Sequence, residues 1–302
     1  MRSLLLNIAV GALVALTACC TDKCAENNEA KKDMGLQLYS IRELIGDSAK
    51  FAENGAAVLD SLAKLGYTEV ETANYNNGKI YGMEPEAFKA VVENAGLKAV
   101  STHTTYRLSD EEVAKADFTE AMKWWDQCIA AHKAAGMEYI VAPSMPTPAT
   151  VKDLDVWCDY YNQVGKKCAD AGMKFGYHNH SFEFTKIEDQ VVFYDYMIEH
   201  TDSAYVFFEM DVYWACMGKA YPVEYFKKYP GRFRLLHIKD HYEIGQSGMV
   251  GFDAIFNNAE TAGLEHLVVE LEGTTSGDIM KGVGECAEYL KNAPFVKATY
   301  SK

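Results

Sequence analysis

The sequence is short of positive charge, and this deficit excludes one class of partner. Lysine and arginine total 29 residues against 43 aspartates and glutamates, which gives a formal net charge of -14. A surface that binds nucleic-acid phosphates needs a basic face, whereas the basic residues of this chain are scattered along its length. We therefore expect no nucleic-acid partner.

Two short motifs are also absent. None of the eight cysteines forms a Cys-X-X-Cys pair, which argues against a zinc ribbon. No Gly-X-Gly-X-X-Gly turn follows an apolar run, which disfavours an open dinucleotide-binding sheet. From Met34 onwards the chain has no linker, low-complexity segment or repeat. We therefore predict one domain over residues 34–302.

The N-terminus carries an apolar run over residues 4–16, which is too short to cross a bilayer and has the length of a secretory h-region. The run ends in Leu-Thr-Ala-Cys at Cys19, which resembles a bacterial lipoprotein signal; a plain signal peptide cleaved nearby is the alternative. We predict a lipoprotein signal peptide over 1–18, lipidation of Cys19 and a flexible tether over 19–33. The domain is then expected to be exported to the periplasm and attached to a membrane only through this lipid anchor.

Eight short apolar runs follow, each succeeded by a pattern typical of a helix. They begin about 30 to 40 residues apart, which is the length of one strand–helix unit. We expect strands over residues 35–39, 68–71, 98–101, 139–142, 174–177, 205–208, 234–237 and 266–269. Alternating strands and helices indicate a parallel sheet, and eight repeats predict an α/β fold of the closed (β/α)₈ type, a TIM barrel.

The segments between these runs show the apolar spacing of amphipathic helices, which we expect over residues 56–65, 84–95, 111–135 and 154–171. A glycine precedes several of the strands, and glycine is the residue favoured where a helix ends in a left-handed turn. These glycines are Gly66, Gly96, Gly136, Gly172 and Gly263. We therefore expect the helices to end at these positions.

Polar side chains stand two residues apart where seven of the eight predicted strands end. The pairs are Gln37/Tyr39, Glu69/Glu71, Ser101/His103, His178/His180, Glu209/Asp211, His237/Lys239 and Glu270/Glu272. Residues two apart share a face of a strand, and barrel active sites form at the C-terminal strand ends. Burying so many ionisable groups without partners costs several kcal/mol each. We therefore expect them to pair, to line a cavity or to bind a metal.

Four of these residues form a set suited to one divalent metal ion. His178, Asp211, His237 and Glu270 come from four successive strands. Imidazole and carboxylate ligands together suit Mn²⁺, Co²⁺, Zn²⁺ or Mg²⁺. Glu209 and Glu272 are alternatively partners of neighbouring charged groups.

At these positions the chain resembles the sugar phosphate isomerase/epimerase superfamily of xylose isomerase-like barrels. The matching stretches are residues 35–42 (GLQLYSIR), 176–184 (GYHNHSFEF), 209–214 (EMDVYW), 236–240 (LHIKD) and 268–272 (VVELE). The resemblance implies a cation held by Glu, Asp, His and Glu from strands five to eight. The last three positions correspond to Asp211, His237 and Glu270, whereas His178 stands where many members have glutamate.

The histidine at position 178 replaces one of the two carboxylates with which ketose epimerases of this superfamily exchange a substrate proton. The remaining carboxylate, Glu270, together with Lys239 and His180, is expected to suit one-sided proton abstraction next to a carbonyl, as in a lyase, dehydratase or isomerase. Lys239, desolvated near the bound cation, is expected to have a lowered pKa and to act as base or donor. The expected contacts of a sugar are Gln37, Tyr39, Glu71, His103 and Trp214, with Tyr106 as a further stacking candidate.

Export bears on the substrate, because sugar phosphates are largely cytoplasmic. We therefore expect a small non-phosphorylated carbohydrate, with elimination or hydration of a 3-keto-glycoside favoured. A ketose epimerase and a non-catalytic sugar-binding lipoprotein remain alternatives. An AP endonuclease of the superfamily is disfavoured, because a further histidine ligand is replaced by Trp214 and the chain is acidic. The sequence does not decide whether the chain forms a homo-oligomer.

Overall fold

The computed structural model describes residues 31–301. The predicted signal peptide, Cys19 and residues 19–30 of the predicted tether lie outside the described residues. Within residues 31–301, none of the helices combines the length and the apolar character needed to span a membrane.

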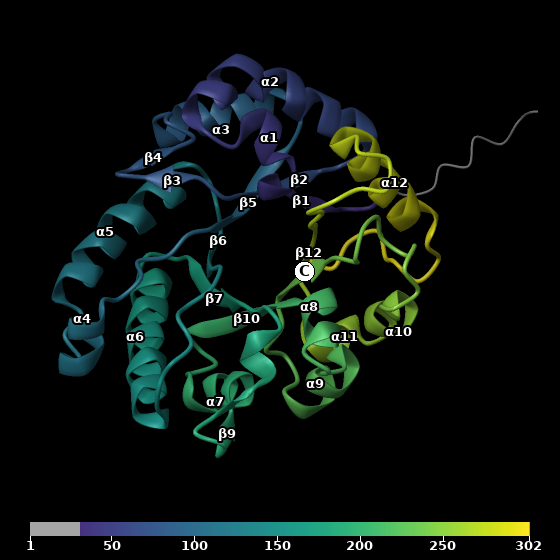
Figure 1. Ribbon diagram of the computed structural model, residues 1–302. Helices are drawn as coiled ribbons and strands as arrows, with labels where there is room; N and C mark the ends of the chain where they lie inside the picture. Colours follow the sequence, from purple (N-terminus) through teal and green to yellow (C-terminus); the bar gives the residue numbers. More distant parts are fainter. Residues whose placement is uncertain (1–30, 302) are drawn as a thin grey trace, which may run out of the picture. The chain divides into compact units, whose positions relative to one another are not determined.

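Eight parallel strands close into a barrel, which confirms the predicted TIM-barrel fold (Figure 1). The strands are β1 (Gly35–Gln37), β2 (Glu69–Thr72), β5 (Lys98–His103), β6 (Tyr139–Ala142), β7 (Lys174–His178), β10 (Val206–Asp211), β11 (Leu235–Ile238) and β12 (His266–Val269). Each pairs in parallel with the next, and β12 pairs with β1. Two hairpins, β3 (Tyr75–Asn76) with β4 (Lys79–Ile80) and β8 (Lys186–Ile187) with β9 (Val191–Val192), lie outside the barrel sheet.

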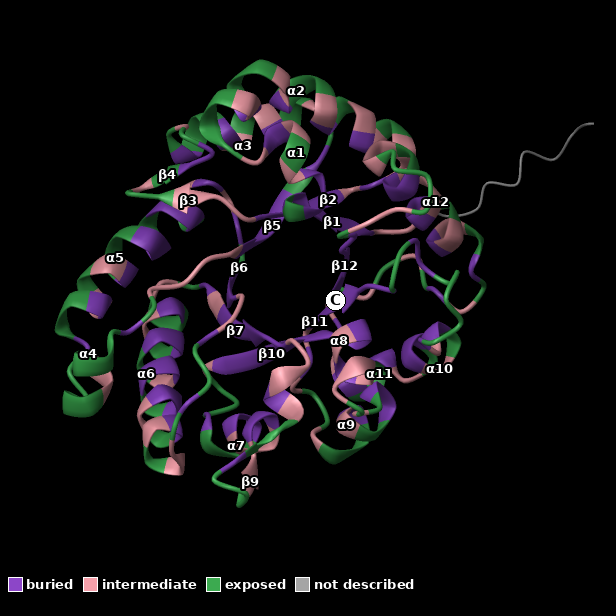
Figure 2. Ribbon diagram, viewed as in Figure 1, coloured by how far each residue is buried: buried purple, intermediate pink, exposed green. Residues whose placement is uncertain are grey.

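Helices surround the strands and turn their apolar faces inward, as Figure 2 shows by their buried inner and exposed outer sides. They are α1 (Arg42–Ile45), α2 (Ser48–Leu65), α3 (Pro85–Asn94), α4 (Asp110–Lys115), α5 (Thr119–Ala134), α6 (Val151–Asp170), α7 (Phe193–His200), α8 (Val212–Met217), α9 (Pro222–Lys228), α10 (Phe252–Asn257), α11 (Ala259–Ala262) and α12 (Ile279–Asn292). The main apolar core lies between sheet and helices. A smaller cluster of Tyr139, Val141, Phe207 and Leu235 fills the barrel interior.

The glycines expected at helix ends adopt the left-handed conformation, with φ of +104° at Gly66, +79° at Gly96, +80° at Gly136, +78° at Gly172 and +83° at Gly263. The backbone turn that each makes confirms the predicted ends of the helical segments.

Several predicted boundaries were wrong. The helix α2 begins at Ser48 instead of residue 56, and β5 and β10 run on to His103 and Asp211. The helix expected over 111–135 is broken into α4 and α5, because Ala116 takes a φ of +48° and the Asp117 carboxylate accepts the backbone N–H of Thr119 at 3.0 Å. The first strand ends at Gln37, whose side-chain carbonyl accepts the backbone N–H of Tyr39 at 2.9 Å and starts a 3₁₀ turn, Leu38–Ile41. Tyr39 therefore does not share a strand face with Gln37.

Candidate functional site

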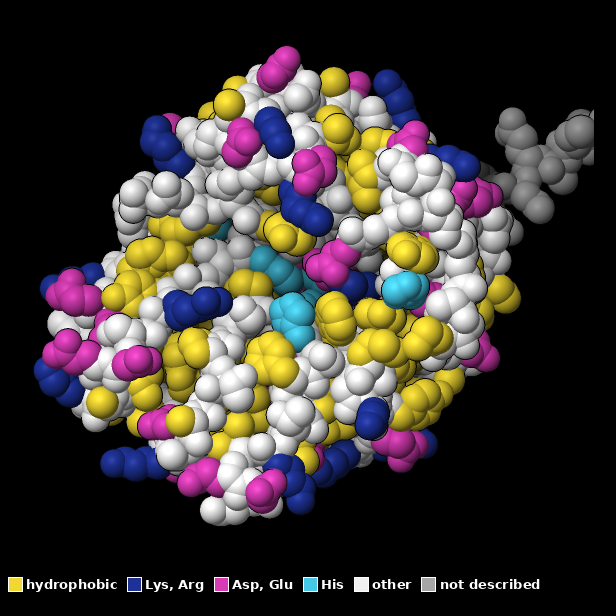
Figure 3. All heavy atoms as spheres, viewed as in Figure 1, with side chains coloured by type: hydrophobic (Ala, Val, Ile, Leu, Met, Phe, Trp, Pro, Cys, Tyr) yellow, Lys and Arg dark blue, Asp and Glu magenta, His cyan; other side chains and the backbone are white. Residues whose placement is uncertain are grey.

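A cavity of about 300 Å³ opens at the C-terminal end of the barrel. In Figure 3, histidine side chains lie at the centre of this face beside a carboxylate. The cavity is lined by Tyr39, Ala73, His103, Pro143, Ser144, His178, His180, Glu270 and Glu272. A larger cavity of about 840 Å³ lies at the N-terminal strand ends. Because barrel chemistry occurs at the C-terminal ends, the smaller cavity is the candidate site.

The four predicted metal ligands come together at this end of the barrel. His178 and Asp211 end β7 and β10, His237 lies in β11, and Glu270 follows β12. Each is buried, and one ligand atom from each lies within 4.8 Å of the others. Parallel register explains this convergence, because Asp211 stands opposite His237 across neighbouring strands.

Two of these side chains keep a ligand atom free while another atom fixes their orientation. One oxygen of Asp211 accepts the backbone N–H of Trp214 at 2.8 Å at the start of α8, and its Oδ2 is buried without a hydrogen-bond partner. His237 pairs its Nε2 with Glu71 at 2.7 Å, and its buried Nδ1 has no hydrogen-bond partner. Carboxylates that orient an imidazole in this way are typical of metal sites. The donor atoms therefore fit a divalent cation.

The carboxylate of Glu71, which contacts the predicted ligand His237, is fully buried. Burial raises its pKa, but the charges of His103 and His237 outweigh that effect and lower the pKa to about 2. Gln37 donates its side-chain amide to the same carboxylate at 2.7 Å. Glu71 is thus an anion that holds His237 in place.

The ammonium group of Lys239 is surrounded by carboxylates, at 3.0 Å from Glu270 and 2.9 Å from Glu272. Burial lowers its pKa, but the charges of Glu270, Asp211 and Glu272 outweigh burial and raise it. The lowering expected beside a bound cation stays a prediction, because the raised pKa belongs to the protein chain without an ion. Lys239 is a cation at neutral pH and is equipped to donate a proton.

His180 lines the cavity, and its buried Nδ1 has no hydrogen-bond partner. Burial lowers its pKa, so the neutral imidazole prevails at neutral pH. Glu183, which the sequence reasoning missed, accepts the backbone N–H of His180 at 2.9 Å and the hydroxyl of Tyr177 at 2.8 Å. This buried carboxyl group holds the segment that carries His180.

The predicted sugar contacts differ in position. Tyr39 and His103 line the cavity, whereas Gln37 and Glu71 are fully buried. The ring of Trp214 lies 5.3 Å from the Lys239 nitrogen. The roles of these five residues stay predictions, and the burial of Gln37 and Glu71 favours positioning over direct contact.

Two other residues from the predicted set lie outside the site. The hydroxyl of Tyr106 donates to Glu112 at 3.1 Å, and its ring packs against Trp124. Glu69 begins β2 and pairs with His266 at 2.8 Å beside the N-terminal cavity. The expected grouping of Glu69 with Glu71 at one strand end was therefore wrong.

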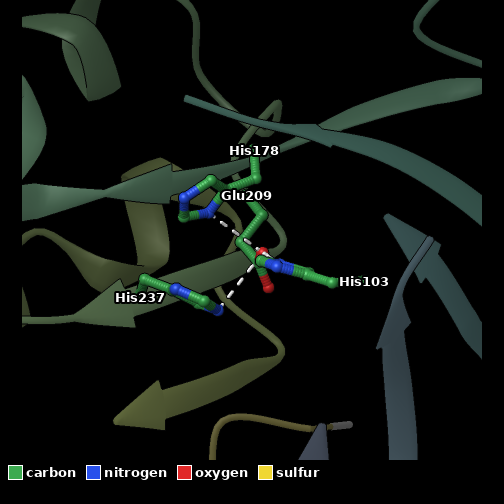
Figure 4. Close-up of side chains that lie close together, drawn as sticks. All are labelled: His103, His178, Glu209 and His237. Atoms are coloured by element: carbon green, nitrogen blue, oxygen red, sulfur yellow. Dashed lines mark hydrogen bonds and ion pairs between the residues drawn. The ribbon is translucent and has the colours of Figure 1, made fainter. Parts of the chain in front are cut away.

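Sequence reasoning gave Glu209 only a secondary place, but the structure puts its carboxylate between His103, His178 and His237 (Figure 4). These four residues form a second group whose ligand atoms lie within 4.8 Å of one another. The sequence could have predicted this position of Glu209, because Glu209 lies two residues before Asp211 and therefore on the same face of β10.

Residues 59–293 match the profile of a protein family described as the xylose isomerase-like TIM barrel. No curated protein sequence matches the chain.

Solved structures extend this likeness over most of the domain. A sugar phosphate isomerase/epimerase from Parabacteroides distasonis is 36% identical, covers 90% of this chain and 97% of its own, and superposes with a TM-score of 0.79. A D-psicose 3-epimerase from Clostridium cellulolyticum is 15% identical, with coverages of 87% and 99% and a TM-score of 0.64. An IOLI protein with a bound zinc atom is 12% identical, with coverages of 87% and 98% and a TM-score of 0.64. The last two likenesses show the fold alone.

Proposed function

Because this chain belongs to the xylose isomerase-like TIM-barrel family, we propose that it is a divalent-metal-dependent enzyme that removes a proton next to the carbonyl of a non-phosphorylated sugar. The favoured substrate is a 3-keto-glycoside, and the favoured reaction is elimination. The same site could also hydrate the unsaturated product, because hydration adds water across the double bond that elimination forms.

The observation that carries this proposal is the set of buried ligand atoms at the cavity. Asp211 Oδ2 and His237 Nδ1 are buried without hydrogen-bond partners, and together with His178 and Glu270 they form one of the two groups able to hold an ion. Leaving such atoms unpaired costs about 1–3 kcal/mol each. A divalent cation supplies the missing partner, and zinc in the distant IOLI relative is consistent with this.

A cation bound there would polarise a substrate carbonyl and stabilise the negative charge that develops on its oxygen. The protein supplies the proton transfers. Neutral His180 or the Glu270 carboxylate accepts the proton from the carbon next to the carbonyl, and the electron pair of that C–H bond forms the new double bond. The ammonium of Lys239 donates a proton to the departing glycosidic oxygen as its bond to carbon breaks. General acid–base catalysis of this kind contributes about 10²–10⁴-fold to a rate.

Two features favour an unphosphorylated substrate and a one-sided reaction. None of the described residues that line the cavity is lysine or arginine, and the nearby Lys239 is paired with Glu270 and Glu272, so no bidentate phosphate clamp is evident there. His178 stands where a second carboxylate would be needed for symmetric proton exchange between epimers. A ketose 3-epimerase is therefore the runner-up, and export with lipid attachment at Cys19 remains part of the proposal.

The test uses protein stripped of metal and reloaded separately with Mn²⁺, Co²⁺, Zn²⁺ and Mg²⁺. Each form is assayed for release of the aglycone from a 3-keto-glucoside and for epimerisation of free ketoses. We expect elimination to disappear on stripping and to return with at least one metal. Glu270→Gln should lower kcat by at least about 10²-fold, because it removes a ligand and a candidate base.

The matched control is Glu69→Gln, which makes the same change inside the barrel but at its opposite end, where Glu69 pairs with His266. This variant should keep the wild-type rate. Equal turnover by stripped and reloaded protein would disprove metal dependence. Epimerised ketose without aglycone release would favour the runner-up, and sugar binding without any turnover would favour a binding protein.

A further inference from the structure

A second group of possible ligands lies deeper in the barrel than the first. It consists of His103, His178, Glu209 and His237, and it shares two histidines with the outer group that contains Asp211. Glu209 precedes Asp211 by two residues on β10, so its side chain lies on the same face one layer further down. In Figure 4 the Glu209 carboxylate points into the space between the three imidazoles.

The distances in this deep group resemble those around a tetrahedral zinc ion. Glu209 Oε2 lies 3.3 Å from His178 Nδ1 and 3.3 Å from His237 Nε2. It lies 2.6 Å from His103 Nε2. With metal–ligand bonds of about 2.0 Å, neighbouring ligand atoms of a tetrahedral zinc site lie about 3.3 Å apart. Two of these three distances already match that spacing. To bind a cation here, His237 Nε2 would have to give up its contact with Glu71 at 2.7 Å.

Unpaired atoms within the deep group point to a missing partner. Glu209 Oε1 and His178 Nδ1 are buried and have no hydrogen-bond partner. Glu209 and His237 are fully buried, and His178 is 2% exposed. A buried polar group without a partner is rare in proteins and calls for an explanation. A cation among these atoms would satisfy them.

We propose that the barrel has a deep cation position at His103, His178, Glu209 and His237, which competes with the outer position for the two shared histidines. A neutral imidazole has one nitrogen lone pair, since its other nitrogen carries a proton. Each shared histidine therefore serves one cation at a time, and the protein holds one ion in one of two places.

The two positions differ in their preference for metals. The deep position offers three nitrogens and one carboxylate, whereas the outer one offers two nitrogens and two carboxylates. Nitrogen-rich sites favour Zn²⁺, and carboxylate-rich sites suit Mn²⁺ and Mg²⁺. Glu209 lies below Asp211 on the same face of β10, so zinc in the deep position lies further from a substrate in the cavity. Only this consequence for turnover rests on the proposed function.

The test separates the positions with two isosteric variants, Asp211→Asn for the outer and Glu209→Gln for the deep one. Purified full-length protein is loaded with Zn²⁺, metal is counted by mass spectrometry after gel filtration, and the ion is located by anomalous diffraction at the zinc edge. We expect one zinc per chain in Asp211→Asn, located between His103 and His237. Adding Glu209→Gln to this variant should weaken zinc binding by at least about 100-fold, because loss of a ligand exceeds the 10–100-fold effect of losing an outer-shell partner.

Two further variants complete the design. Glu69→Gln changes a carboxyl group at the opposite end of the barrel, where it pairs with His266, and it should bind zinc as the wild type does. His103→Gln removes a deep ligand without touching the outer group, and it replaces Glu209→Gln if that variant does not fold. Anomalous density outside the deep position in Asp211→Asn, or equal zinc affinity with and without the deep substitution, would overturn the inference. These readouts do not involve turnover, so absence of sugar chemistry would leave them unaffected.

Discussion

Replacing Glu183 by glutamine should make the free energy of unfolding less dependent on pH. The Glu183 side chain is fully buried next to His180 and Tyr177. Burial disfavours its charged form and raises its pKa from 4.5 to about 7, although hydrogen bonds from Tyr177 and from the backbone of His180 oppose this change.

The sign and size of the effect follow from proton linkage. Below pH 4.5 the carboxyl group is protonated in both states and contributes nothing to the pH dependence. Between 4.5 and about 7 only the unfolded chain loses the proton, so rising pH favours unfolding. Above pH 7 the penalty is complete, and a pKa difference of about 2.5 corresponds to about 3 kcal/mol.

The assay is urea unfolding of wild type and Glu183→Gln at several pH values between 4.5 and 8. Comparing the pH dependence of the two proteins cancels the constant cost of the substitution. From the lowest to the highest pH, the wild type should lose about 3 kcal/mol more than the variant. Parallel curves for the two proteins would show that Glu183 ionises normally in the folded protein and would refute the reasoning.

The remaining predictions concern packing and attachment. Gly165→Ala in α6 should destabilise the protein by about 1–3 kcal/mol in thermal or urea unfolding, because the new Cβ would lie 2.5 Å from the carbonyl oxygen of Tyr205. Gly284→Ala in α12 is its control and should cost less, since its Cβ meets only the flexible end of Leu65 at 3.2 Å; equal losses would contradict the argument. Cys19→Ser should move the protein from the membrane fraction to the soluble periplasmic fraction, and an unchanged distribution on fractionation would rule out the lipid anchor.

The predictability of the fold came from local patterns. Alternation of strands and helices predicted the barrel, and glycines such as Gly66 and Gly172 marked helix ends because only local backbone conformation decides those positions. The break between α4 and α5 was missed because it depends on the left-handed backbone of Ala116 and on the contact of Asp117 with Thr119, which interrupt an otherwise continuous helical pattern.

The site was less predictable than the fold, because its chemistry depends on distances between strands. Lys239 could be placed at a strand end from the sequence, but the direction of its pKa change depends on Glu270 and Glu272, which come from another strand end. Gln37 was expected to face the sugar, yet it is turned towards Glu71 on the neighbouring strand.

By itself the sequence determined how many strands the barrel has and which polar residues lie at their C-terminal ends. Both follow from periodicities within short segments. Only the tertiary structure decided which of these residues meet. It brought Glu209 among three imidazoles and left Asp211 and His237 with free ligand atoms. The physical reason is that strand register and side-chain direction are set across the closed sheet, between residues far apart in the chain.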